Sequence, residues 1–400
     1  MNIAWEQWEY DPLSGSIYMA DYQRTNYFKT KALRELHGLK WKVPNISGFN
    51  ELIIRDGKLY TTAGLRVVDI ADGTLLKTFD PPQMAGMLES PPVFYKDYVI
   101  VTGSFSFLFL DPVTLEKKNQ YFIGWDNGNV TLAIDGNLAF IGTKDLKDEP
   151  VGQMLAIDLE KLEVAWASKT YWAGFSGSAT AVSDGLVYFC GCNGYYCFNA
   201  VNPQRNKDGE AIENWSFKKG TGAISYKNGK DHSPVIYKDK VYATTRDGLY
   251  ELDKKTGKVL WEYHMPFING KIINAITTNP TIKNWKLYIG IRDLSDVYSS
   301  KNEYGRGFII EIDLKNKKIT KFMCNENEII TRTDMPIAEN ILYYKVENEK
   351  ERKTYVVAFD ISLKKELWRF NLPYRSETSP LIHDGVVYIT DTNGFLYALY

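Results

Sequence analysis

The sequence predicts an all-β fold in which eight four-stranded antiparallel sheets close into a ring, an eight-bladed β-propeller. Three observations predict it: a composition rich in strand-forming residues, a unit of about 45 residues that recurs along the chain, and hairpin signals in each unit. The 400 residues include 27 Tyr and 10 Trp, and aromatic and β-branched side chains favour strands. A chain of this length can bury a large core.

The repeat is clearest at the end of each unit, where an aspartate is followed eight residues later by an aromatic residue. We expect the aspartate to open a tight turn by accepting backbone N–H bonds, and the tryptophan to cover apolar surface between neighbouring sheets. These residues are therefore interpreted as structural. Three copies keep both residues: Asp158 with Trp166, Asp253 with Trp261, and Asp360 with Trp368. Looser copies place Asp69, Asp111 and Asp313 before Phe79, Tyr121 or Phe122, and Phe322.

Each unit also begins with a hairpin signal between apolar runs. An Asp-Gly pair there favours a type I′ turn, because both central residues need positive φ. The pairs are Asp56-Gly57, Asp135-Gly136, Asp184-Gly185 and Asp384-Gly385, with Lys96-Asp97 and Lys238-Asp239 in two further units.

Strand counts predict how the ring closes. The middle strands number eight, but the outer aromatic strands from Phe79 to Trp368 number seven. When the C-terminal unit is aligned with the unit around Asp253, Tyr400 falls at the aspartate position, so the outer strand is missing there. The run Leu39–Val43, which contains Trp41, resembles the other outer strands and is expected to complete the last sheet. Such closure protects sheet edges.

The repeat divides the chain into an N-terminal extension, residues 1–36, and one propeller, residues 37–400. Within the extension, a strand is expected at Ser16–Ala20 and a short helix or a strand at Lys29–Leu36. The sequence does not decide whether this extension plugs the ring, covers an edge or mediates an interaction.

Charge and hydropathy narrow the possible partners. The formal net charge is −1, which gives no general field for nucleic acid or acidic membranes. No stretch approaches the roughly 18 apolar residues of a membrane span. The first residues lack a basic segment and an apolar run, so we expect a cytoplasmic protein if Met1 is native, and a periplasmic or envelope protein if a signal was removed. We expect the propeller to be monomeric.

The cysteines allow two interpretations. Cys190, Cys192 and Cys197 lie close together, while Cys324 stands apart. A metal site usually needs paired Cys-x2-Cys motifs or nearby histidines, and the chain has only 4 His. Buried strand cysteines are the interpretation that we favour.

The stretches "ELDKKTGKVLW" (Glu251–Trp261), "AFDISLKKELW" (Ala358–Trp368) and "AIDLEKLEVAW" (Ala156–Trp166) resemble the tryptophan-docking repeat of the PQQ-like, or quinoprotein-type, propellers. The resemblance spans residues 37–400 and implies an eight-bladed ring. The family includes quinone-dependent dehydrogenases and a non-enzymatic propeller scaffold of the bacterial outer-membrane barrel assembly machinery, to which this chain is closest in style.

The features of the enzymatic branch are not recognisable. Its alcohol dehydrogenases carry an adjacent Cys-Cys pair over the quinone, whereas this chain has Cys190-Gly191-Cys192. There is no Cys-x-x-Cys-His haem motif in the sequence, and no set of Asp, Glu and Asn calcium ligands aligns with it. We therefore expect no cofactor, neither PQQ nor calcium, and fold likeness alone does not establish an activity.

Long connections concentrate on one predicted face, where binding loops of a rigid scaffold usually lie. The alternative for each aromatic residue in these loops is packing on its own blade. The candidate partner-binding residues are Trp125, Trp172, Phe175, Tyr226, Phe267 and Tyr298.

Polar residues begin the inner strands and are expected to rim the central channel. They could bind a metal or act as acid and base, but a solvated channel mouth without a reaction is the interpretation that we favour. The candidate rim residues are Glu51, Glu89, His232, Asn279, Asp334 and Glu377.

These observations lead to one functional hypothesis and one alternative. The first is a non-enzymatic, soluble propeller scaffold that binds a protein through its loop-rich face. The alternative is an enzyme or ligand-binding protein that uses the channel, either of the quinone and calcium dehydrogenase kind or acting on carbohydrate.

Overall fold

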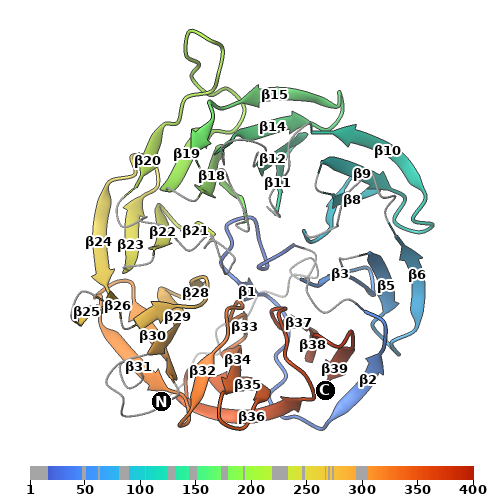
Figure 1. The fold of residues 1–400 in the computed structure, drawn as a ribbon, viewed down its shortest axis with the longest axis vertical. Helices are drawn as coiled ribbons and strands as arrows, with labels where there is room; N and C mark the ends of the chain where they lie inside the picture. The colour runs from blue at the N-terminus through green and yellow to red at the C-terminus, as the bar shows by residue number, and fades with distance from the viewer. Residues whose placement is uncertain are drawn as a thin grey trace, which may run out of the picture.

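The structure is a computed structural model. It describes residues 17–46, 51–61, 64–80, 90–103, 105–123, 131–143, 151–172, 179–191, 194–218, 233–245, 248–265, 267–268, 271–272, 274–293 and 305–400. Within these residues there are strands and no helix. The strands form eight antiparallel blades around a central axis (Figure 1). The predicted eight-bladed propeller is confirmed.

Blades 1 to 4 each contain four strands, and in chain order these strands lie successively farther from the centre of the ring. Blade 1 contains β3 (Ile53–Arg55), β4 (Lys58–Tyr60), β5 (Leu65–Asp69) and β6 (Leu75–Phe79). Blade 2 contains β7 (Val93–Tyr95), β8 (Tyr98–Thr102), β9 (Ser106–Leu110) and β10 (Lys117–Phe122). Blade 3 contains β11 (Ala133–Asp135), β12 (Leu138–Gly142), β14 (Met154–Asp158) and β15 (Glu163–Ala167). Blade 4 contains β17 (Ala181–Ser183), β18 (Leu186–Gly191), β19 (Gly194–Asn199) and β20 (Trp215–Phe217).

Blades 5 to 8 follow the same plan, but the innermost strand is split in two in blades 6 and 7. Blade 5 contains β21 (Val235–Tyr237), β22 (Lys240–Thr245), β23 (Gly248–Asp253) and β24 (Val259–His264). Blade 6 contains β27 (Asn274–Ile276), β28 (Thr281–Lys283), β29 (Lys286–Asp293), β30 (Arg306–Asp313) and β31 (Ile319–Met323). Blade 7 contains β32 (Glu328–Ile330), β33 (Ile337–Ala338), β34 (Ile341–Asn348), β35 (Lys353–Asp360) and β36 (Lys365–Leu372). Blade 8 contains β37 (Leu381–His383), β38 (Val386–Thr390), β39 (Leu396–Leu399) and β2 (Leu39–Val43).

The antiparallel order gives the ring two different faces. We call the side that carries the first hairpin of each blade and its aspartate turn the turn face. The other side, which carries the second hairpins and the connections between blades, is the loop face. Two short antiparallel pairs extend loop-face connections: β13 (Val151–Gly152) with β16 (Tyr171–Trp172), and β25 (Phe267–Ile268) with β26 (Lys271–Ile272).

The first hairpins adopt the predicted turns, with one shift of register. Both central residues have positive φ at Asp56-Gly57, Asp184-Gly185 and Asp384-Gly385, as type I′ turns require. In blade 3, however, Asp135 pairs with Leu138, so Gly136 and Asn137 form the centre of the turn. The prediction of Asp135-Gly136 as the central pair is therefore wrong by one residue, because Asp135 is the last residue of strand β11.

The N-terminal strand completes the last blade. Strand β2 pairs antiparallel with β39, from Leu39 opposite Leu399 to Val43 opposite Leu396. Trp41 lies opposite Ala398, beyond a bulge, and its exposed fraction is 9%. The predicted closure of the ring is confirmed.

Tryptophans connect neighbouring blades at the turn face. The indole N–H of Trp41 donates to Ile70 O, that of Trp166 to Ala200 O, and that of Trp215 to Lys254 O. Each acceptor directly follows the aspartate, or its asparagine equivalent, in the next blade. Gly257 has φ +68° and lies under Trp215, where a Cβ atom would be 2.6 Å from the indole Cδ2. This turn therefore requires glycine for both its backbone and the indole.

The N-terminal extension differs from its predicted secondary structure. Residues 17–20 form a turn, with Ala20 N donating to Ile17 O, and not a strand. Residues 29–36 form neither a helix nor a strand. The only strand within the described residues 17–36 is β1 (Tyr27–Phe28), which pairs parallel with β33. Both predictions are wrong because contacts with the ring determine this segment's backbone.

Candidate functional site

We call residues 17–36 the axial segment; it begins at the centre of the ring and then runs outward between blades 7 and 8 toward β2 (Figure 1). The inner strands of blades 4 to 7 each direct a central N–H group toward the axis. In an open channel these groups would need water, but here backbone carbonyls of the axial segment accept them. The bonds run from Val182 N to Tyr22 O (2.9 Å), from Ile236 N to Gln23 O (2.8 Å), from Ile282 N to Thr25 O (2.9 Å), and from Ile337 N to Asn26 O (3.0 Å).

Arg24 is the central side chain of the axial segment. Its exposed fraction is 0%, and its guanidinium donates to Thr180 O (2.8 Å), Tyr18 O (2.8 Å) and Leu132 O (3.3 Å). Three carbonyls from different parts of the fold thus share one fork-shaped donor. Arg24 and Asn26 also have positive φ, an uncommon backbone state for residues other than glycine that persists where surrounding contacts impose it.

A chain of hydrogen bonds links the starts of the inner strands from blade 4 to blade 1. We call its side chains, Ser233, Asn279, Asp334, Ser379 and Glu51, the polar belt. All five are buried. The bonds run from Ala179 N to Ser233 Oγ (2.8 Å), from Ser233 N to Asn279 Oδ1 (2.7 Å), from Asn279 Nδ2 to Asp334 Oδ1 (2.8 Å), from Asp334 N to Ser379 Oγ (3.0 Å), and from Ser379 N to Glu51 Oε2 (3.0 Å).

The axial segment also contacts the polar belt through a phenol. Tyr18 donates its hydroxyl proton to Asp334 Oδ2 at 2.8 Å. Burial, together with the Asp334 carboxylate, raises the pKa of Tyr18 well above its ordinary value. Burial lowers the pKa of Arg24 and raises the pKa of Asp21, whose carboxylate accepts from Thr25 N. These shifts come mainly from the loss of solvent.

The predicted rim residues have different environments. Glu51, Asn279 and Asp334 belong to the polar belt, where each is bonded across a blade seam and is not simply solvated, whereas Glu377 is partly exposed. Glu89 and His232 lie outside the described residues. Ser233, Ser379 and Arg24 were not among the residues predicted from the sequence. A signal for the first two exists, because Ser233, Asn279 and Ser379 each directly precede a proline at the start of an inner strand.

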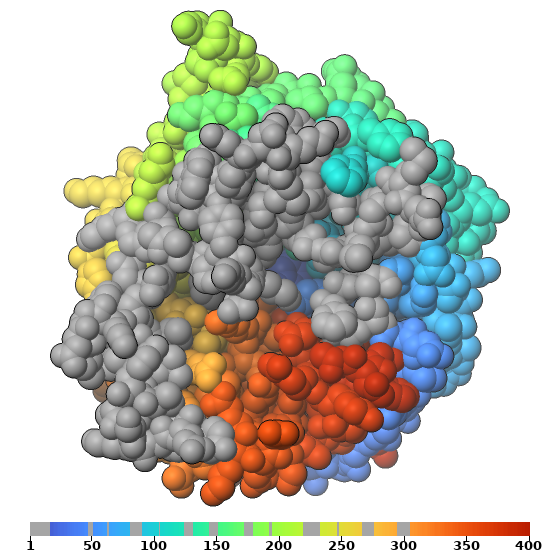
Figure 2. All heavy atoms as spheres, viewed as in Figure 1, coloured from blue at the N-terminus to red at the C-terminus, as the bar shows by residue number. Residues whose placement is uncertain are grey.

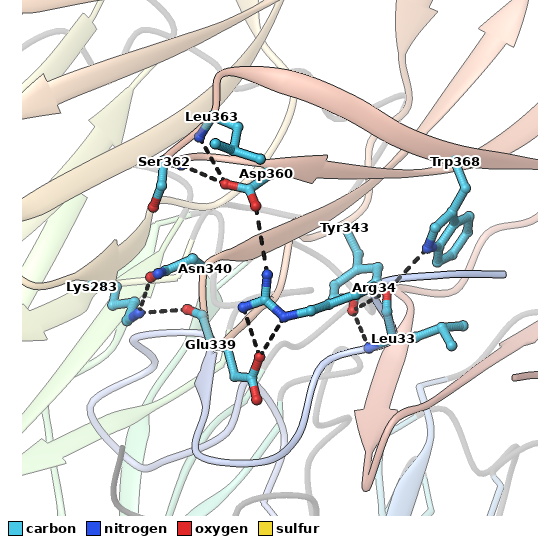
Figure 3. A network of polar contacts seen from close by, with 10 residues as sticks. All are labelled: Leu33, Arg34, Lys283, Glu339, Asn340, Tyr343, Asp360, Ser362, Leu363 and Trp368. Carbon is cyan, nitrogen blue, oxygen red and sulfur yellow. Dashed lines mark hydrogen bonds and ion pairs between the residues drawn. The ribbon is translucent and has the colours of Figure 1, made fainter. Parts of the chain in front are cut away.

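The second end of the axial segment is fixed at the turn face (Figure 3). Arg34 donates from Nε and Nη2 to Glu339 Oε2, at 3.0 and 2.9 Å. Leu33 N donates to the Tyr343 hydroxyl, which in turn donates to Leu33 O. Leu33 O also accepts the indole N–H of Trp368 at 3.0 Å. Trp368 of blade 7 therefore docks on the axial segment, where other tryptophans dock on the following blade.

The described residues show no ready-made metal site beside the axis. In the described part of the chain, no group of three His, Cys, Asp or Glu side chains is placed to hold a metal ion. The Glu51 and Asp334 carboxylates already accept hydrogen bonds across blade seams. Calcium needs six to eight oxygen ligands, and these two carboxylates together supply at most four.

Two of the predicted partner-binding aromatics lie on described strands of the loop face. Trp172 belongs to β16 and is paired with Val151, and Phe267 belongs to β25 and is paired with Ile272. The other four, Trp125, Phe175, Tyr226 and Tyr298, lie outside the described residues. Their role in binding stays a prediction.

The described cysteines are buried on or beside strands. Cys190, on β18, and Cys197, on β19, are buried, as is Cys324, which follows β31. Burial raises the pKa of both Cys197 and Cys324 to about 12. Because the thiolate is the form that binds metal and attacks electrophiles, neither sulfur is prepared for these reactions at neutral pH. Cys192 lies outside the described residues.

We expect Cys197 and Cys324 to resist alkylation in the folded protein at about pH 8. This pH is close to the pKa of a free thiol but about four units below the raised pKa values of these two cysteines. Peptide mapping after iodoacetamide treatment measures this, with the denatured chain as the control. Labelling of either cysteine at the rate seen in the denatured chain would contradict the expectation.

The ring, its docked tryptophans and its aspartate turns define a PQQ-like β-propeller. The chain belongs to the family described as outer membrane protein assembly factor BamB, which matches residues 65–355. No curated protein sequence matches the chain. No helix in the described residues is long and apolar enough to cross a membrane.

Solved structures with very different sequences share the fold. A europium-containing methanol dehydrogenase is similar with a TM-score of 0.68 and 11% identity, covering 97% of this chain and 98% of that chain. BamB from Moraxella catarrhalis is similar with a TM-score of 0.60 and 10% identity, covering 90% and 97%. The computationally designed protein Ika8 has a TM-score of 0.60 and 15% identity, covering 92% and 99%. At these identities the likeness concerns the fold alone.

Proposed function

We propose that this protein is a non-enzymatic scaffold that binds another protein through its loop face. The observation that carries the proposal is the closed centre of the ring. The axial segment satisfies the inner strands of blades 4 to 7, and the polar belt bonds its own members. Among the described residues, the inner-strand amides of blades 4 to 7 and the polar belt are therefore engaged in hydrogen bonds at the axis. We therefore place the protein-binding site on the outer surface of the propeller and not in its channel.

The loop face is the better of the two surfaces for this role. Its connections are long, and the two strand pairs β13–β16 and β25–β26 give part of it regular backbone structure. Rigidly held loops bind at a smaller entropic cost than loops that must be ordered. Aromatic residues such as Trp172 and Phe267 are frequent energetic centres of protein interfaces.

The channel enzyme is the weaker candidate. A europium-containing dehydrogenase shares the fold, but the described carboxylates at the axis are engaged in seam bonds and Arg24 fills the centre. The description of the family as an outer membrane protein assembly factor supports binding to proteins. It also favours the envelope over the cytoplasm as the location, which fractionation of native cells tests.

Replacement of Trp125, Trp172 and Phe175 by alanine is expected to reduce capture of the partner by at least about tenfold, the loss that about 1.4 kcal/mol of binding energy gives. The measurement is affinity capture from native lysate followed by quantitative mass spectrometry. A matched control is Tyr98→Ala, which removes an exposed aromatic residue at the turn face. Equal capture by the triple variant and the control would contradict the choice of face.

A further inference from the structure

The aspartate turns on the turn face are built alike in six blades but differ in charge. Each turn takes six residues, begins at its aspartate and joins the third strand of a blade to the outer strand. In blades 5 and 6 the turn contains three lysines beside the aspartate, and in blade 7 it contains two. These basic turns are residues 253–258, 313–318 and 360–365.

The corresponding turns on the other side of the ring are acidic. In blades 1, 2 and 3 each turn has a net charge of −2. These acidic turns are residues 69–74, 111–116 and 158–163. Figure 1 places blades 1 to 3, which end at β15, on the side of the ring opposite blades 5 to 7, which end at β36. The small net charge of the chain, −1, therefore conceals a turn face with one basic half and one acidic half.

Two lysines of the basic turns are engaged in the fold and are not available to a partner. Lys254 pairs with Asp184 of blade 4, and Lys317 pairs with Glu251 of blade 5. The other six lysines are all exposed, and we call them the basic arc. The basic arc consists of Lys255, Lys258, Lys315, Lys318, Lys364 and Lys365.

The aspartates of the basic turns face their own backbone. The carboxylates of Asp253, Asp313 and Asp360 each accept two backbone N–H groups of the turn that they open. The lysine ammonium groups, in contrast, stand at the ends of long side chains that reach into solvent. At physiological salt the Debye length is only about 8 Å, so an approaching surface senses the lysines before the aspartates.

Contacts between neighbouring blades connect the three basic turns. The Lys317 ammonium of the blade 6 turn lies 5.4 Å from the centre of the Trp261 ring on the outer strand of blade 5. The Lys364 ammonium of the blade 7 turn lies 6.0 Å from the centre of the Phe322 ring on the outer strand of blade 6. Each turn thus rests against the preceding blade, and the basic arc is one band along the ring.

The blade 7 turn adds an apolar side chain to the basic arc. Leu363 is 62% exposed and directly precedes Lys364 and Lys365. Lysines beside an exposed apolar residue suit the headgroup layer of a bilayer, where the apolar side chain enters the layer and the ammonium groups meet anionic lipids. Proteins that bind nucleic acid usually add arginine forks or stacking aromatic rings, and the three basic turns contain neither.

We propose that the basic arc binds the surface of a bilayer that contains anionic lipids. Clusters of lysines are attracted to such a surface, and the attraction falls off within a Debye length. The acidic turns of blades 1 to 3 are repelled by the same surface. The ring therefore meets the bilayer with blades 5 to 7 and is tilted away from it at blades 1 to 3.

This orientation is compatible with the other exposed parts of the ring. The connection between β19 and β20 of blade 4, residues 200–214, projects outward from the rim (Figures 1 and 2). It is attached to blade 3, where Ala211 N donates to Ala167 O at 2.8 Å, and so belongs to the half that is tilted away. The loop face lies on the other side of the ring and stays accessible to a protein partner.

Co-sedimentation with lipid vesicles tests the proposal. The chain is expected to bind vesicles of phosphatidylglycerol and phosphatidylcholine in equal amounts, and not vesicles of phosphatidylcholine alone. Reversal of two equivalent charges of the basic arc, with Lys258→Glu and Lys318→Glu, is expected to lower the partition coefficient by at least about tenfold. Salt at about 1 M, where the Debye length is about 3 Å, is expected to release the unchanged chain from the vesicles.

A matched control reverses two exposed lysines on the outer strands of blades 1 and 2, with Lys77→Glu and Lys117→Glu. This variant has the same net charge as the first, and it is expected to bind anionic vesicles like the unchanged chain. Circular dichroism of both variants verifies that the ring is folded.

Three results would overturn the proposal. The first is failure of the unchanged chain to bind anionic vesicles at low ionic strength. The second is equal binding by the basic-arc variant and the control. The third is binding of a duplex oligonucleotide through the basic arc without binding of vesicles, because the occupant would then be a nucleic acid. Since the vesicles contain no protein, none of these results depends on the loop face or its partner.

Discussion

A chain that begins at residue 44 is expected to lose cooperative folding, whereas a chain that begins at residue 37 is expected to fold with reduced stability. The first lacks both the axial segment and strand β2. The second lacks residues 1–36, which include the axial segment, but keeps β2. Urea unfolding followed by circular dichroism, together with light scattering, measures the difference.

The larger effect follows from the position of β2 in blade 8. Without it, strand β39 presents an unpaired edge, although its residues Leu396–Leu399 have exposed fractions of 0 to 2% in the complete ring. The loss of Trp41 also removes the docking bond to Ile70 O, so the seam between blades 8 and 1 opens. An exposed apolar strand edge promotes aggregation, and we expect the chain from residue 44 to aggregate.

The smaller effect follows from the bonds of the axial segment. Four inner-strand amides and the Trp368 indole lose their acceptors. At about 1 kcal/mol for each hydrogen bond, the free energy of unfolding should fall by on the order of 5 kcal/mol. If the chain from residue 37 had a free energy of unfolding within about 0.5 kcal/mol of that of the unchanged protein, the role assigned to the axial segment would be contradicted. A normal unfolding transition for the chain from residue 44 would contradict the role of β2.

Local patterns predicted the blades because each strand carries its own signal. The Asp56-Gly57 pair needs positive φ and has it, with values of 51° and 72°. The spacing between Asp253 and Trp261 places both residues on one hairpin, and β23 and β24 pair as expected. Ring closure was also predictable, because strand counts expose a missing outer strand that only the run around Trp41 resembles.

The axial segment was not predictable in the same way. Its sequence has no regular spacing of apolar residues that would indicate a strand or a helix. In addition, Met19, Ala20, Arg24 and Asn26 all adopt positive φ. Such conformations are unfavourable locally and are maintained here by contacts with five blades. Arg24 illustrates the difficulty, because arginine is almost never fully buried, and its three acceptors come from positions far apart in the sequence.

Loss of the Arg24 side chain is expected to be the most damaging single change in the axial segment. In Arg24→Ala, the carbonyls of Thr180, Tyr18 and Leu132 lose their donor inside the protein. A buried acceptor left without a partner costs about 1–3 kcal/mol, so the free energy of unfolding should fall by about 3 kcal/mol or more. Guanidinium unfolding measures this, provided that the slope with denaturant is unchanged.

Arg24→Lys separates the effect of charge from that of geometry. Lysine keeps the positive charge near Asp21 and Asp334, which both act on Arg24 electrostatically. Its single ammonium group, however, lacks the planar fork that reaches three carbonyls. We expect a loss of stability between that of the unchanged chain and that of Arg24→Ala. If lysine restored full stability, charge would be the dominant contribution. If Arg24→Ala lay within about 0.5 kcal/mol of the unchanged protein, water would replace the guanidinium, and the closed centre of the ring would not depend on this side chain.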